Sequence, residues 1–172
     1  MPARLRFSSI QTGLVLFWAI WLSVVSATNV FDALKQLGLL PPGFTLASYN
    51  FDLIAETIGP HGIPPLGAAI LFAGVILWQL LASGLLWRAW WNLVGGAPGT
   101  AAEVTQAFAI SLGLWAAFLI ATELTVSYAT AATHKATLIA QLVSLIVIRL
   151  RDRAPEAPQP EHAARSREAV AE

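Results

Sequence analysis

Residues 64–87, PPLGAAILFAGVILWQLLASGLLW, contain no charged side chain and decide what kind of fold the chain adopts. A helix of about 20 mostly apolar residues is long enough to cross the hydrocarbon core of a bilayer, which is about 30 Å thick. Pro64 and Pro65 suit the first turn of such a helix, because the backbone N–H that proline lacks has no helical partner there. The stretch therefore predicts a membrane-spanning helix.

The composition of the whole chain agrees with a membrane protein. Of the 172 residues, 56% are hydrophobic and 12% are charged, whereas about a quarter of the residues in a soluble domain are charged. The formal net charge is zero, so no overall basic field favours nucleic acid as a partner. The absence of cysteine excludes disulfides, thiolate metal sites and cysteine nucleophiles.

Three further stretches are long and apolar enough to cross a bilayer, namely residues 10–27, 102–128 and 132–149. The last is the shortest and takes a few small residues from the turn before it to complete its crossing. The sequence therefore predicts an all-α polytopic membrane protein, folded as an antiparallel bundle of four transmembrane helices. This membrane domain is expected to cover residues 1–150.

Two local patterns mark the connection between the second and third spans. GGAPG, residues 95–99, is typical of a turn. Thr100 and Glu103 then form a Thr-x-x-Glu pattern, which predicts a capping box whose two side chains accept hydrogen bonds from the backbone at the helix start. We therefore expect the third helix to begin close to Thr100.

Small residues recur along three of the expected spans at helical spacing. In lipid, helices associate through close backbone approach, which small residues permit. The pattern favours a compact bundle, and the alternative is that these are alanine-rich faces turned toward lipid. The residues are Ala109, Gly113, Ala117 and Ala121 in the third span, Ala19, Ser23 and Ala27 in the first, and Gly67 and Gly74 in the second.

Basic residues near the span ends predict the orientation. Six arginines fall on one side of the expected bundle, whereas Lys35 and Lys135 fall on the other. Cytoplasmic loops carry the excess of basic residues, so we expect both termini in the cytoplasm and residues 28–63 and 129–133 outside a bacterial inner (plasma) membrane. The arginines are Arg4, Arg6, Arg88, Arg149, Arg151 and Arg153. The interface on this side is marked by Trp87, Trp90 and Trp91.

A cleaved secretory signal is the alternative interpretation of the first span. Basic MPARLR, an apolar run and VSA before Thr28 resemble a signal with a cleavage site after Ala27. The apolar run at residues 10–27 is longer than the roughly 7–15 residues of a signal core, and it contains two tryptophans. We favour an uncleaved span, and a mature chain that begins at Thr28 would contradict the four-span topology.

The segments outside the spans differ in character. Residues 28–63 are too many for a simple turn. Within them, NVFDALKQLG (29–38) and NFDLIAETIG (50–59, with Asn50 as the expected N-cap) predict two short amphipathic helices, which we expect to form a lid over the outer end of the bundle. Residues 151–172 are charged and proline-rich, which predicts a disordered cytoplasmic tail.

Polar side chains gather at the outer ends of the expected spans, where no nucleotide-binding loop, nucleophile elbow or HExxH pattern occurs. Glu123 lies near the end of a helix, where the helix dipole disfavours a carboxylate. The next span begins nearby with His134 and Lys135, so we expect a structural clasp between Glu123 and one of them. The alternative is a functional site, with Asp32, Glu123 and His134 as the ligands of any metal. The whole cluster comprises Asn29, Asp32, Glu123, Tyr128, His134 and Lys135.

Three polar side chains lie deeper in the expected spans. They are Gln79, Gln141 and Ser144. Polar groups at this depth hydrogen-bond between helices, with about 1 kcal/mol of stabilisation each. We therefore expect them to join helices rather than to form a proton path.

The segments WAIWLSVVSATNVFDALKQLGLL (18–40) and LWAAFLIATELTVSYATAATHKATLIAQLVSLI (114–146) resemble a family of small bacterial four-span integral membrane proteins that is uncharacterised. The resemblance covers about residues 10–150. It implies the four-span topology, and it implies no activity, substrate, cofactor or catalytic residue.

The sequence predicts a non-enzymatic protein of the inner membrane, in contact with lipid. It would serve as an accessory or assembly subunit of a larger complex, or it would associate with copies of itself. The alternative is a membrane-embedded oxidoreductase or binding protein that holds a metal, a quinone or a lipid at the outer ends of its helices. The sequence leaves the cofactor open.

Overall fold

The structure, a computed structural model, describes residues 9–152, and within this range the chain is helical and contains no strand. The elements are α1 (Ser9–Gln36), α2 (Asn50–Ile58), the 3-10 helix η1 (Gly59–His61), α3 (Pro65–Gly95), α4 (Thr100–Leu124) and α5 (Ala131–Asp152). Four of these helices, α1, α3, α4 and α5, are long and apolar enough to cross a membrane. The predicted all-α bundle of four transmembrane helices is therefore confirmed, and the protein is a multi-pass membrane protein.

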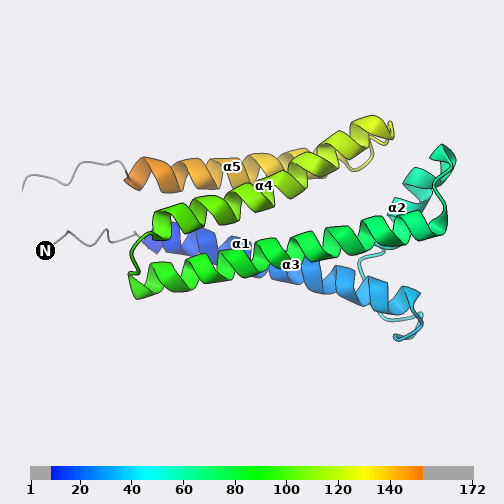
Figure 1. The fold of residues 1–172 in the computed structure, drawn as a ribbon, viewed down its shortest axis with the longest axis horizontal. Coiled ribbons are helices and arrows are strands. Elements are labelled where there is room, and N and C mark those ends of the chain that lie inside the picture. Colours follow the sequence, from blue (N-terminus) through cyan, green and yellow to red (C-terminus); the bar gives the residue numbers. More distant parts are fainter. Residues whose placement is uncertain (1–8, 153–172) are drawn as a thin grey trace, which may run out of the picture.

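The four long helices converge at one end of the molecule and diverge at the other (Figure 1). We call the first the terminal end, since α1 begins and α5 ends there, beside the turn at residues 96–99. The other is the loop end, with residues 37–64 and 125–130. Along the bundle α3 packs against α1 and α4, and α4 packs against α5. The short helix α2 packs against α3 and α1 at the loop end.

The tightly packed core fills the terminal half of the bundle. Leu22, Leu86 and Phe108 are fully buried there, and alanines at the same level let the helices approach closely. Those alanines are Ala19, Ala82, Ala89 and Ala107, each 0% exposed. The predicted set in α4 packs only in part. Gly113 lies against Trp78 of α3 and Ala117 is half-buried. Ala109 and Ala121 are exposed, and Ala107 is the alanine of α4 that turns inward.

Polar side chains join the helices across this core. Trp18 donates its Nε1–H to Ser144 Oγ at 3.0 Å, and Gln141 Nε2 donates to Ser111 Oγ at 2.7 Å. Nearer the loop end, Asn29 Nδ2 donates to Gln79 Oε1 at 2.8 Å. Gln79, Gln141 and Ser144 thus each take part in a hydrogen bond between helices.

Substitutions of the two partners in the buried Gln141–Ser111 hydrogen bond are expected to affect stability unequally. Gln141 Oε1 is buried and has no partner among the described residues, so Gln141→Leu removes an unsatisfied oxygen and leaves one small buried group, the Ser111 hydroxyl, without its partner. We expect it to change the unfolding free energy by less than about 1 kcal/mol. Ser111→Ala leaves the whole Gln141 amide without a side-chain partner and should cost about 1 kcal/mol or more. Thermal unfolding in detergent tests this order, and a greater loss in Gln141→Leu would contradict it.

The helix bounds differ from the sequence prediction mainly in α1. The helix predicted separately at residues 29–38 is the last part of α1, which runs without a break to Gln36. No glycine or proline lies between Gly13 and Gly38, and Gly38 ends the helix with φ 73°. At the other spans α3 extends to Gly95 and α4 already ends at Leu124. The predicted tail lies outside the described residues beyond the end of α5.

The capping box predicted at the start of α4 does not form, although the helix does begin at Thr100. Gly99 holds the N-cap position with φ 80° and no side-chain cap is present. The Glu103 carboxylate instead accepts hydrogen bonds from Arg88 Nη2 at 2.7 Å and Asn92 Nδ2 at 2.5 Å. Two donors on α3 lie within reach of the carboxylate, so it joins α3 to α4 at the terminal end.

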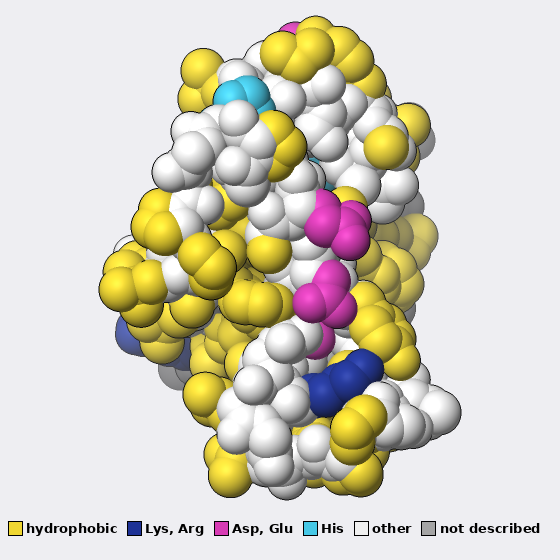
Figure 2. Space-filling model, turned by 90° about the vertical axis from the view of Figure 1, so that its right-hand side faces the viewer, with side chains coloured by type: hydrophobic (Ala, Val, Ile, Leu, Met, Phe, Trp, Pro, Cys, Tyr) yellow, Lys and Arg dark blue, Asp and Glu magenta, His cyan; other side chains and the backbone are white. Residues whose placement is uncertain are grey.

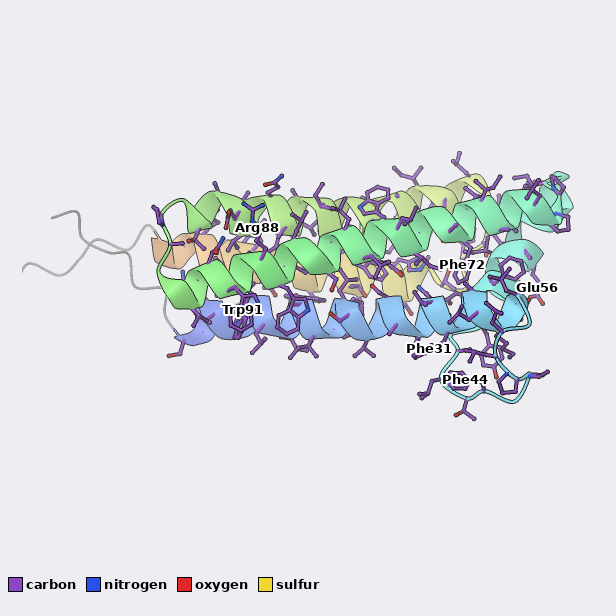
Figure 3. All side chains as sticks on the ribbon, turned by 60° about the horizontal axis from the view of Figure 1, so that its bottom comes forward. Phe31, Phe44, Glu56, Phe72, Arg88 and Trp91 are labelled. Atoms are coloured by element: carbon purple, nitrogen blue, oxygen red, sulfur yellow. The ribbon has the colours of Figure 1, made fainter. Side chains whose placement is uncertain are left out.

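Side chains of different character occupy the two ends (Figure 3). Arg88 and Trp91 lie near the terminal end, where α3 and α4 are joined. Phe31 packs on Phe44 near the loop end, with ring centroids 5.3 Å apart, and this contact folds the segment after α1 back against that helix. Figure 2 faces the loop end and shows a short row of acidic side chains, with hydrophobic side chains exposed on either side.

Candidate functional site

The polar cluster predicted at the outer helix ends separates into two parts. Asn29 and Asp32 lie on α1 and are 1% and 0% exposed. His134 lies partly buried near the start of α5. The other members are exposed, namely Glu123, Tyr128 and Lys135. All six residues thus lie toward the loop end, and the buried part of the cluster is the part with a defined geometry.

Asp32 holds the start of α2 against α1. Its Oδ2 accepts a hydrogen bond from the backbone N–H of Phe51 at 2.9 Å and another from Ser48 Oγ at 3.2 Å. The first N–H groups of a helix have no helical partner, and a carboxylate satisfies them well. The predicted N-cap role of Asn50 is therefore wrong. Tyr49 precedes α2 without a side-chain cap, and Asp32 supplies the acceptor from a different helix.

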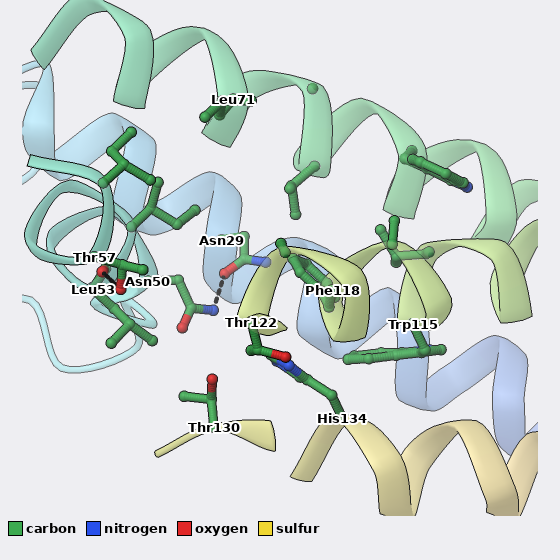
Figure 4. Close-up of a pocket in the computed structure, with 18 of the residues that line it drawn as sticks. Asn29, Asn50, Leu53, Thr57, Leu71, Trp115, Phe118, Thr122, Thr130 and His134 are labelled. Atoms are coloured by element: carbon green, nitrogen blue, oxygen red, sulfur yellow. Dashed lines mark hydrogen bonds between the residues drawn. The ribbon is translucent and has the colours of Figure 1, made fainter. Parts of the chain in front are cut away.

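Asn29 connects three elements at the same level. Its Nδ2 donates to Gln79 of α3, and its Oδ1 accepts from Asn50 Nδ2 at 2.8 Å and from Ser48 Oγ at 2.6 Å. The dashed line in Figure 4 marks the bond to Asn50. Asn29 thus places two further amide side chains beside one another at the junction of α1, α2 and α3.

A cavity of about 510 Å³ lies where the long helices diverge (Figure 4). Side chains from α1, α2, α3, α4 and α5 line it, together with the turn between α4 and α5. Most lining side chains are apolar, and no Asp, Glu, Lys or Arg is among them. Both the size and the composition are typical of sites for small molecules, which measure roughly 300–1,000 Å³.

The polar groups of the cavity face each other across it. Asn29 and Asn50 lie on one side, and Thr122 and His134 on the other (Figure 4). The His134 ring stacks on Phe118, with centroids 4.9 Å apart and planes at 18°. Its Nδ1 is buried without a hydrogen-bond partner among the described residues. The arrangement offers amide, hydroxyl and imidazole groups to a molecule that otherwise touches apolar walls.

The predicted clasp between Glu123 and His134 or Lys135 is wrong. The ion pair that the structure describes joins Arg88 of α3 to Glu103 of α4 at the terminal end, and none is described for Glu123. Glu123 lies in the exposed last turn of α4, where water solvates the carboxylate and no cationic partner is needed. The His134 ring packs on Phe118 instead.

The alternative of a metal at Asp32, Glu123 and His134 is also wrong. Among the described residues, no three His, Asp or Glu side chains lie close enough together to hold a metal ion. Asp32 is turned toward the start of α2, whereas Glu123 is exposed on α4 and His134 faces the cavity. Asp32, Glu123 and His134 lie at the same end of the bundle, but their side chains do not lie close together.

The sequence analysis missed several residues of the cavity wall. Trp115, Phe118 and Thr122 follow one another at steps of three and four, which places them on one face of α4. The same face points at His134, so the spacing could have indicated a common wall. Ser48 carries no such signal, since it lies in the irregular segment before α2 and reaches Asn29 and Asp32 only through the fold.

No protein-family model, curated protein or solved structure matches this chain.

Proposed function

We propose that this protein is a membrane-embedded binding protein that holds an amphiphilic molecule of the lipid or quinone class in the cavity at its loop end. The observation that carries the proposal is the cavity itself, with an apolar wall, a pair of buried amides and an imidazole. Apolar walls favour a hydrocarbon or ring system by excluding it from water, and the few polar groups fix its orientation. Holding such a molecule requires no catalytic residue.

The charge distribution supports an orientation with the terminal end in the cytoplasm of a bacterial cell. Arg88 and Arg149 lie at the terminal end among the described residues, and Lys35 and Lys135 lie toward the loop end. Basic residues favour the cytoplasmic side. In this orientation the cavity opens in the outer half of the plasma membrane. The predicted family membership, a group of small bacterial four-span proteins, fits the same topology and stays a prediction.

The proposal is tested by identifying the small molecules that remain bound to the protein when it is extracted together with its surrounding lipid. The full chain is released from membranes in polymer nanodiscs, washed into detergent and analysed by mass spectrometry for small molecules. We expect one amphiphile at close to one mole per mole of protein, enriched over its share of the membrane lipid. A lipid content that matches the bulk membrane would contradict the proposal.

A second candidate is the accessory or self-associating subunit expected from the sequence, and α5 favours it. This helix packs along α4 and meets α1 only near the terminal end, so most of its length has a single neighbour. Its outward face is apolar and comprises Ile139, Leu142, Val143, Ile146 and Leu150. A partner helix covering this face would protect introduced cysteines there from labelling in native membranes, whereas labelling equal to that of a lipid-facing site on α3 would contradict it.

A further inference from the structure

The cavity has a distinctive electrostatic character, which constrains what it can hold. Its lining includes one titratable side chain, His134, and its other polar groups are amides, hydroxyls and the indole N–H groups of Trp78 and Trp115. The carboxyl group adjoining the amide end is Asp32, which is fully buried and whose Oδ1 has no partner within residues 9–152. A phosphate or carboxylate placed there would lose its hydration and gain no cationic partner among the described residues.

An uncharged headgroup meets matching groups in the same place. Gln79 lines the cavity and is 2% exposed. Its Oε1 accepts from Asn29, and its Nε2 donates to no other group that the structure describes. Since Gln79 lines the cavity, this N–H can donate to a ligand oxygen that lies there. A carbonyl or hydroxyl oxygen fulfils this need without the desolvation cost of a charge.

Several exposed residues that line the cavity lie on α3 and α4, and this exposure indicates an apolar side opening between the two helices. Trp78 closes the seam between these helices on the terminal side, since its Nε1 donates to the backbone oxygen of Ile110 at 2.9 Å and its ring lies against Gly113. Beyond Trp78 the two helices diverge (Figure 1). The lining residues there are small or exposed, with Gly74 and Ala121 facing outward and Ile70 65% exposed.

The depth of this opening matches the acyl chains of one leaflet. Trp87, Trp90 and Trp91 mark the interface at the terminal end. A helix crosses the hydrocarbon core in about 20 residues, which places the opposite boundary near the first turns of α3. Gly74 and Trp78 then lie within the hydrocarbon of the loop-end leaflet. The lining residues nearest the loop end are polar by contrast, including Thr125, Ser127 and Thr130.

We propose that the ligand is an amphiphile with an uncharged, oxygen-bearing headgroup, and that it reaches the cavity sideways from the loop-end leaflet, through the opening between α3 and α4. The headgroup oxygen accepts from Gln79 Nε2, and the tail extends past Gly74 into the bilayer. The inference rests on the proposed binding function and adds the headgroup chemistry and the route. A quinone and a neutral acylglycerol share this chemistry.

The test uses the full chain in phosphatidylcholine vesicles with a trace of one photoreactive probe, followed by mapping of the cross-linked residues. The probes are a quinone, a diacylglycerol and a phosphatidylglycerol. We expect at least one neutral probe to label cavity residues ten-fold or more above the anionic probe. The neutral probe that labels more strongly shows whether the ligand is a quinone or an acylglycerol. Labelling of the cavity by the anionic probe at an equal or higher level overturns the inference, while the binding function stands. If no probe labels the cavity, the proposed binding function and the inference about the headgroup are both contradicted.

Two glycines of α3 provide matched variants for the route. A Cβ atom added at Gly74 or at Gly84 meets no neighbouring atom within 4 Å, and both residues are exposed, so the two positions are matched for substitution. Gly74 lines the opening, whereas Gly84 is exposed on α3 outside the cavity. We expect Gly74→Trp to lower labelling by the neutral probe at least ten-fold and Gly84→Trp to leave it within two-fold. Equal labelling of both variants overturns the side route.

Gln79→Leu tests the proposed donor separately, because leucine is similar in size and has no N–H. We expect the preference for the neutral over the anionic probe to fall at least five-fold. A preference that does not change overturns the role of Gln79 as the headgroup donor. Tryptophan fluorescence and elution volume, compared with those of the unaltered protein, establish that the variant is folded.

Discussion

Ala117→Phe is expected to remove at least nine-tenths of the amphiphile that co-purifies with the protein. Ala117 lies on α4 in the wall of the cavity. A phenyl group in place of a hydrogen of the Ala117 methyl projects into a space of about 510 Å³ that the ligand would occupy. Phenylalanine is compatible with a transmembrane helix, so the change fills the cavity and leaves the helix intact. Mass spectrometry of the extracted lipid gives the ligand content per mole of protein.

Ala109→Phe is the control for this result. Ala109 belongs to the same small-residue series of α4, two turns nearer the terminal end, and it is exposed outside the cavity. The same added volume then faces lipid, and the ligand content should stay within two-fold of the unaltered protein. A loss in both variants, or in neither, would show that the bound molecule does not occupy this cavity.

The second large effect concerns Asp32. Asp32→Ala removes the acceptor of the Phe51 N–H and one acceptor of the Ser48 hydroxyl, while the cavity left by the carboxyl group stays away from bulk water. A buried donor left without a partner costs about 1–3 kcal/mol. We therefore expect the free energy of local opening of α2 to fall by about 2 kcal/mol. This corresponds to roughly 30-fold faster hydrogen exchange of the α2 amides. Exchange mass spectrometry of peptides that cover residues 50–58 measures this rate.

Two further variants separate the hydrogen bonds of Asp32 from its charge. Asp32→Asn keeps an acceptor oxygen at the same place, so exchange in α2 should rise less than ten-fold. Asp52→Ala removes an exposed carboxylate on α2 whose described partner is Gln36 Nε2 at 3.1 Å, and such surface contacts contribute little. Exchange as fast in Asp52→Ala as in Asp32→Ala would contradict the assigned role.

The spans could be predicted because the signal for them is local. A run such as residues 64–87 satisfies every backbone group within its own helix, so its structure in lipid depends on no distant partner. The turn at GGAPG and the start of α4 at Thr100 follow from the same kind of short-range pattern. These features need no knowledge of which helix lies next to which.

The partners of polar side chains could not be predicted in the same way. Glu103 suited a capping box on its own helix, but Arg88 and Asn92 of α3 lie close enough to bind its carboxylate first. Asp32 was assigned to the polar cluster at the outer ends of the spans, and the fold buries it against Ser48 and Phe51. In each case the competing partner lies between 11 and 19 residues away, and its proximity depends on packing.

The cavity also depends on how the helices pack. Asn29 and His134 were both assigned to the outer polar cluster, and both do line the cavity. What the sequence lacked was the divergence of α4 and α5 from α1 and α3, which opens a space between them (Figure 1). Helix crossing geometry depends on side-chain contacts at the seam, such as Trp78 on Gly113, and these have no signature in hydropathy.

The divergence of the helices has a consequence for the membrane around the protein. Since the bundle is narrower at the terminal end than at the loop end, it occupies unequal areas in the two leaflets, like a wedge. A wedge is accommodated with least strain where the bilayer bends so that the leaflet at its broad side is expanded. The protein is therefore expected to concentrate where the membrane is convex on the side of α2, and to resist being placed in a membrane of the opposite curvature.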